Sequence, residues 1–278
     1  MRTHTLVFTM LATLVAAGCH HSASPTPSEP AAGDEGPGAA EAVVPSPPPP
    51  VQVMAGPRTP IEGPAPTIRV TSPRANQLVR NGHVMLRAQV DHWPLAPEPG
   101  NHVHVIIDNE PYIAVRDLSK PIDLNALVEK ALGHPLAEGT HVLRMFPSRS
   151  QHESVKEGEP FVVRVFSYKK RTPGFRFDPK APLLTYSRPK GCYPSDSSVL
   201  LDFYVSGIPE LSTDGYRVRY LIDDSVEGVI ATWSPHYINH LLDGQHTIEL
   251  TLIGPDGEPV PGPFNHTKRV ITLAEHCV

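Results

Sequence analysis

Two histidines one residue apart, His102 and His104 in the segment GNHVHVIID, are by type the residues best suited to bind a metal ion. Imidazole is a good ligand for zinc and copper. Alternate side chains of a β-strand share a face, so the two imidazoles would lie on one side and Val103 and Val105 on the other. The apolar side must face a core, and we therefore predict that the histidines point outward from it.

A metal site needs further ligands, and His92 is the third histidine that the sequence suggests. However, a later segment, GYRVRYLIDD, repeats the pattern of GNHVHVIIDN with Arg217 and Arg219 at the two histidine positions. Arginine is not a usual metal ligand, because its guanidinium group keeps its charge. The repeat favours a plain polar strand face, and metal binding by His102 and His104 remains the alternative.

The other polar motifs indicate turns rather than catalysis. The sequence contains neither a G-x-S-x-G element nor a glycine-rich phosphate loop. Asp108 and Asp223 each follow an apolar segment, at a place where aspartate is favoured for local hydrogen bonds. His141 and His246 occupy equivalent places in a repeated L-x-[ED]-G-x-H element, and we expect each to hydrogen-bond the preceding turn. We expect no enzymatic activity and no cofactor.

Aromatic residues in proline-marked loops could serve binding instead. Trp233 and Tyr237 in ATWSPHYIN are the foremost, with Trp93 and Tyr112 as further examples. Exposed rings would form a platform for a glycan or a protein, whereas a small β-sandwich also needs large aromatics to fill its core. The exposure of these rings distinguishes the two hypotheses.

The N-terminus predicts export and attachment to a membrane. MRTHTLVFTMLATLVAAGC has an early arginine, an apolar run and small residues before Cys19, which is the layout of a signal peptide. The run is shorter than the roughly 20 residues that a spanning helix needs. VAAGC resembles the lipobox of bacterial lipoproteins, which implies removal of residues 1–18 and acylation of Cys19, with palmitate among the chains. His20, where aspartate would imply retention at the inner membrane, favours the outer membrane.

Charge and cysteine content narrow the possible partners and the compartment. The formal charge of -5 without a block of like charges gives no reason to expect nucleic acid as a partner. Without Cys19, the even pair Cys192 and Cys277 remains in an oxidising compartment, and we predict that it forms a disulfide. Neither cysteine lies in a CxxC motif, which argues against zinc binding there.

After a linker, the chain contains the same module twice. Residues 19–66 are rich in proline and small residues, which predicts a disordered linker behind the lipidated cysteine. Beyond it, VMLRAQV matches VLLDFYV and LAEGTHVLRM matches LLDGQHTIEL, in short alternating segments that are typical of strands. The pattern resembles bacterial immunoglobulin-like or fibronectin-like modules, which implies two tandem antiparallel β-sandwiches. The predicted parts are a first module at 67–167, an interdomain linker at 168–182 and a second module at 183–278.

One helix is predicted within the first module. IDLNALVEKALG at 122–133 has helical periodicity, with Asp123 as a possible N-cap and Gly133 as a stop. This helix either covers an open end of the sandwich or forms a lid over a ligand site.

Together these patterns predict a lipid-anchored envelope protein with a structural or interaction role. Its partners would be the bilayer, through acylated Cys19, and an unknown envelope protein or glycan. The alternative is an envelope metal-binding protein that uses the outward-facing His102 and His104 of the first module.

Overall fold

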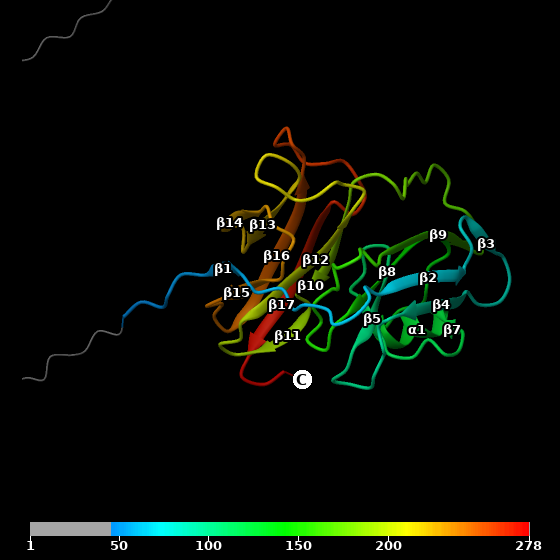
Figure 1. The fold of residues 1–278 in the computed structure, drawn as a ribbon, viewed down its shortest axis with the longest axis horizontal. Coiled ribbons are helices and arrows are strands. Elements are labelled where there is room, and N and C mark those ends of the chain that lie inside the picture. Colours follow the sequence, from blue (N-terminus) through cyan, green and yellow to red (C-terminus); the bar gives the residue numbers. More distant parts are fainter. Residues whose placement is uncertain (1–45, 278) are drawn as a thin grey trace, which may run out of the picture. The chain divides into compact units, whose positions relative to one another are not determined.

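The chain folds almost entirely into β-strands (Figure 1). The computed structural model describes residues 46–277, so the predicted signal peptide and Cys19 lie outside the described residues. Within the described part there is one short helix, and no helix is long and apolar enough to cross a membrane. Four sheets form two sandwiches, which confirms the predicted fold class.

Two sheets make up the first sandwich. The smaller has the strand order β2-β4-β7 and the larger β3-β9-β8-β5-β6. Neighbouring strands are antiparallel except β3 and β9, which run parallel. The strands are β2 (Thr67–Ser72), β3 (Gln77–Val79), β4 (Met85–Asp91), β5 (His102–Ile107), β6 (Ile113–Val115), β7 (Ile122–Asp123), β8 (Gly139–Ser148) and β9 (Val162–Tyr168).

The second sandwich has the same plan with one added strand from far upstream. Its sheets have the orders β1-β15-β12-β10 and β11-β17-β16-β13-β14. Only β11 and β17 run parallel. The strands are β1 (Gln52–Ala55), β10 (Leu183–Arg188), β11 (Gly191–Pro194), β12 (Val199–Ser206), β13 (Arg217–Ile222), β14 (Val226–Ile230), β15 (His236–Asn239), β16 (Gly244–Ile253) and β17 (His266–Ala274).

The helix α1 (Leu124–Leu132) belongs to the core of the first sandwich. Asp123 caps its N-terminus by accepting hydrogen bonds from the backbone amides of Asn125 and Ala126, as the sequence predicts. Gly133 ends it in the left-handed conformation, with a φ of 78° that glycine adopts without strain. Leu124 and Val128 are buried in the core, so the helix covers the sandwich as an integral part of it.

The end of the expected disordered linker is ordered, which corrects the prediction for this stretch. Residues 51–59, here called the strap, contain β1, whose Val53 pairs with Ile238 of β15. Val51 and Val53 pack on the second core. The strap begins with VQVMA, an alternating segment without proline, and it completes a sheet edge that β15 would otherwise leave unpaired. The chain thus crosses the second sandwich before it forms the first.

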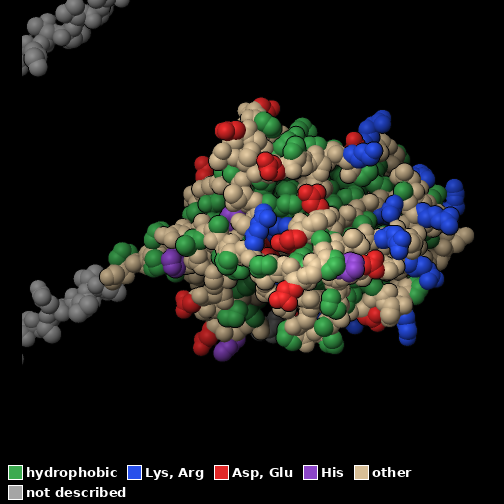
Figure 2. All heavy atoms as spheres, in the orientation of Figure 1, with side chains coloured by type: hydrophobic (Ala, Val, Ile, Leu, Met, Phe, Trp, Pro, Cys, Tyr) green, Lys and Arg blue, Asp and Glu red, His purple; other side chains and the backbone are tan. Residues whose placement is uncertain are grey.

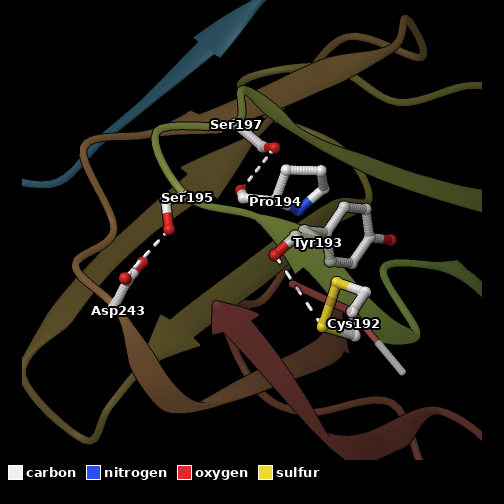
Figure 3. The surroundings of a disulfide bond; sticks show 7 residues. Cys192, Tyr193, Pro194, Ser195, Ser197 and Asp243 are labelled. Atoms are coloured by element: carbon white, nitrogen blue, oxygen red, sulfur yellow. Dashed lines mark hydrogen bonds between the residues drawn. A yellow bond between two sulfur atoms is a disulfide. The ribbon is translucent and has the colours of Figure 1, made fainter. Parts of the chain in front are cut away.

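The predicted disulfide joins Cys192 and Cys277, with 5.5 Å between their Cα atoms. It links β11 to the segment that follows β17, and these two strands also pair along their length. Figure 3 shows the bond beside the turn in which the Ser195 hydroxyl donates to Asp243 over 2.9 Å. The disulfide therefore holds the C-terminal end of the chain to an edge strand of the second sandwich.

Positive charge is concentrated at one end of the first sandwich, although the whole chain carries a formal charge of -5. Lysine and arginine side chains gather over the region of β2, β3 and β4 (Figure 2). The exposed basic residues of these strands, of their connections and of the segment that follows β9 are Arg69, Arg74, Arg80, Arg87, Lys169, Lys170 and Arg171.

Candidate metal centre

The outer face of β5 is covered by the second sandwich. His102 and His104 are both 0% exposed. His104 Nδ1 lies 3.1 Å from the hydroxyl of Ser187 on β10, and Lys190 Nζ donates to the carbonyl of Tyr112 over 2.7 Å. The two histidines do point away from the first core, as predicted, but the face that carries them is buried and is not the plain polar strand face that the repeat favours. Strand alternation identifies the side away from one core, whereas the partner surface on that side comes from another module.

A third histidine completes the group. His152, in the connection between β8 and β9, places its Nδ1 2.9 Å from His102 Nε2. His104 Nε2 lies 3.0 Å from the same atom, and all three nitrogens lie within 4.8 Å of one another. His92, the third ligand suggested by sequence, is exposed and is not part of this group.

The hydrogen bonds of the group leave a shared place for a cation. His102 Nδ1 lies 3.0 Å from the Gly100 carbonyl, which only accepts, and the tautomer that forms this hydrogen bond leaves the lone pair of Nε2 available to a ligand. That lone pair can accept one proton, yet the nitrogens of His104 and His152 both lie within 3.0 Å of it. Tetrahedral Zn–N bonds of 2.0–2.1 Å separate ligand nitrogens by about 3.3 Å, close to these distances. Two of the three nitrogen separations therefore suit a shared metal ion, and the third is at most 4.8 Å.

The surroundings keep the three imidazoles neutral. Burial lowers the pKa of His102 to about 4, and the charges of Arg116 and Arg188 act in the same direction. Burial and then Arg188 lower the pKa of His152 to about 3. Burial also holds the pKa of His104 well below its usual range. Because metals bind the neutral ring, protons do not compete for these ligands at neutral pH.

Aromatic rings cover the His104 side of the group. The Tyr112 ring stacks on His104 with 3.7 Å between centroids, and the Phe146 ring meets His104 edge-on at 5.3 Å. Tyr112 is 2% exposed, so it is a wall of this centre and not a surface platform. These rings limit access of water to the His104 side of the group, while His152 is half-buried.

The other aromatic candidates also pack inward. Trp93 is buried, and its indole donates to the carbonyl of Ser148. Trp233 is half-buried and meets the ring of Tyr204 edge-on at 4.8 Å. Half-buried Tyr237 pairs with Met54 of the strap, and its ring packs so closely against Gly56 that a side chain at that position would not fit. Trp233 and Tyr237 therefore form no exposed platform in the described structure.

The repeated histidines His141 and His246 make equivalent hydrogen bonds that hold the preceding turn. Each ring places Nδ1 within 2.7 Å of an aspartate, Asp108 or Asp223, and Nε2 within 2.8 Å of a backbone carbonyl in the preceding turn. This confirms their expected hydrogen bonds to that turn. Burial lowers the pKa of His141, but the hydrogen bond and charge of Asp108 outweigh it and raise the pKa above its usual value. These residues serve the fold and lie outside the three-histidine group.

The sequence alone carries no signal for His152. It lies 50 positions from His102, outside any strand, and no repeated element marks it. His102 and His104 could be predicted as a pair, because residues at this spacing on one strand share a face.

Comparison with known proteins gives only distant structural similarities. No protein family and no curated protein matches the sequence. Similar solved structures include fibronectin(III)-like modules of Clostridium thermocellum CbhA, at 15% identity over 74% of this chain and 94% of that chain with a TM-score of 0.26. Bacteroides ovatus SGBP-B, solved in complex with a mixed-linkage heptasaccharide, has 13% identity over 76% and 48% of the chains and a TM-score of 0.23. The chicken CNTN1 FN1-FN3 domains have 12% identity over 75% and 66% and a TM-score of 0.21.

Proposed function

We propose that this protein is a lipid-anchored, non-enzymatic envelope protein that binds a metal ion between its two sandwiches. The observation that carries the proposal is the convergence of three imidazole nitrogens, from His102, His104 and His152, within 4.8 Å of one another. Two hydrogen bonds support their orientation, one from His102 to a backbone carbonyl and one between His104 and Ser187. Such outer partners are typical of histidine ligands in metal sites.

Replacement of His152 by asparagine is expected to weaken zinc binding by at least about a hundredfold, because loss of a ligand costs more than the 10- to 100-fold that loss of an outer partner costs. Asparagine suits this position, since its left-handed backbone, with a φ of 69°, favours asparagine over alanine. Competition with a chromophoric chelator, using purified full-length protein first stripped of metal, measures the affinity for Zn(II).

The matched control is His92→Asn. His92 also has a left-handed backbone, with a φ of 58°, but it lies outside the three-histidine group. This variant is expected to bind zinc as the unchanged protein does. Equal, weak binding by all three proteins would refute metal binding at this group, and loss in the His92 variant alone would place the ligand elsewhere.

The proposed anchor rests on the N-terminal sequence. Two or more acyl chains on Cys19 give stable attachment, because each buried methylene contributes about 0.8 kcal/mol. The unchanged protein is expected in the detergent-extracted outer-membrane fraction of the expressing bacterium, and Cys19→Ser is expected to lose this attachment. Membrane fractionation with an immunoblot measures both, and equal membrane association of the variant would contradict lipidation at Cys19.

A further inference from the structure

We propose that the three-histidine centre prefers monovalent copper, Cu(I), over divalent ions such as Zn(II). This inference rests on the proposed metal-binding function and identifies the ion. It follows from three properties of the centre, which are ligands without charge, cationic neighbours and burial.

The ligands bring no negative charge to the ion. The convergent group consists of His102, His104 and His152 and contains no carboxylate or thiolate. Glu98, the acid that forms an ion pair at the edge of the centre, reaches Arg116 at 3.2 Å, and its side chain is 75% exposed. Its charge is therefore largely screened by water and offsets little of the positive charge of Arg116.

Positive side chains surround the centre instead. Arg116 places a guanidinium nitrogen 3.3 Å from His102 Nδ1. Lys190 Nζ lies 3.9 Å from the centroid of the Tyr112 ring, which itself stacks on His104. Arg188, at the end of β10, lowers the pKa of all three histidines through its charge. Its Nε is buried without a hydrogen-bond partner, so no acceptor neutralises this side of the guanidinium.

The charge of the ion decides which metal such a centre tolerates. Repulsion from the three cations grows in proportion to the ion's charge. The cost of removing an ion from water grows with the square of its charge, and His102 and His104 are fully buried. Among the metals that imidazole binds well, copper has a stable monovalent state. Zinc held by three protein ligands also keeps a water as its fourth ligand, which the rings of Tyr112 and Phe146 disfavour on the His104 side of the centre.

The test compares Cu(I) and Zn(II) affinities of the unchanged full-length protein and Arg188→Gln. Cu(I) is measured under nitrogen by competition with bicinchoninate. Ascorbate is the reductant, because a thiol would compete for copper and exchange with the disulfide. The unchanged protein is expected to bind Cu(I) more tightly than Zn(II). Removal of the Arg188 charge should tighten both, and the gain in log affinity for Zn(II) should be about twice that for Cu(I), in the ratio of their charges.

Two further variants keep the test decisive. Arg116→Gln removes a cation that belongs to the first sandwich. Its gain in log affinity for Zn(II) should also be about twice that for Cu(I), even if Arg188→Gln disturbs the contact between the two sandwiches. Arg80→Gln removes an exposed charge and should change neither affinity. Tighter binding of Zn(II) than Cu(I) by the unchanged protein, or equal gains for both ions, would overturn the preference and leave metal binding intact. Binding of neither ion would overturn the proposed function itself.

Discussion

Replacement of Asp202 by alanine is expected to destabilise the protein by about 3–5 kcal/mol, because it leaves a buried positive charge without a partner. Asp202 lies on β12 of the second sandwich, and its side chain is fully buried. Lys156, from the connection between β8 and β9 of the first sandwich, donates to it over 2.8 Å and has a 4% exposed side chain. Ser154 also donates to Asp202, through its backbone amide and its hydroxyl.

The shift of the urea unfolding midpoint measures this loss. A double variant, Asp202→Leu with Lys156→Met, is the control, and it should lose less stability than Asp202→Ala, because it removes the buried charge and leaves only the two Ser154 donors without their acceptor. A loss below about 1 kcal/mol in Asp202→Ala would show that the pair does not hold the two sandwiches together. Since His152 lies in the same connection as Lys156, the single variant should also weaken zinc binding more than the double variant does.

Replacement of both Cys192 and Cys277 by serine is expected to destabilise the second sandwich by about 4–5 kcal/mol. The disulfide joins residues 85 positions apart, and closing a loop of that length removes unfolded-state entropy of this size on the chain-entropy account. Urea unfolding in the absence of reductant measures the loss. Hydrogen exchange should rise in β11 and β17 while β5 and β8 remain protected.

The unchanged protein treated with dithiothreitol is the natural comparison for the double serine variant. The two should unfold at the same urea concentration, because both lack the same covalent link. A serine variant as stable as the untreated protein would mean that the strand pairing of β11 with β17 holds the C-terminal segment without the disulfide.

Local patterns predicted those features that depend on neighbouring residues. Alternation assigned the two sides of β5, and an aspartate and a glycine marked the ends of α1, because strand faces and helix caps are set within a few positions of the chain. The paired cysteines followed from their number and from the oxidising compartment that the signal sequence implies. The equivalent turns at His141 and His246 followed from comparing the two copies of the module.

Features that depend on two distant surfaces could not be predicted in this way. His102 and His104 are buried because Ser187 and its neighbours cover them, and no alternation within β5 encodes that contact. His152 joins them from an irregular segment whose path is fixed by tertiary contacts, including the Lys156–Asp202 pair. Proline content predicted an irregular linker, and within its described part, residues 46–66, VQVMA departs from this because an unpaired strand edge existed elsewhere.

The strap also has a consequence for the order in which the protein can fold. β1 is made early, yet its partner β15 is made only after the whole first sandwich, since Gln52 pairs with Asn239. Contacts of such long sequence separation form slowly, because closing the loop costs entropy before the contact is gained. During synthesis, β1 therefore stays unpaired until the first sandwich and then β15 have been made. A second sandwich made without residues 52–55 would keep the edge of β15 free to accept a strand from another copy of the chain.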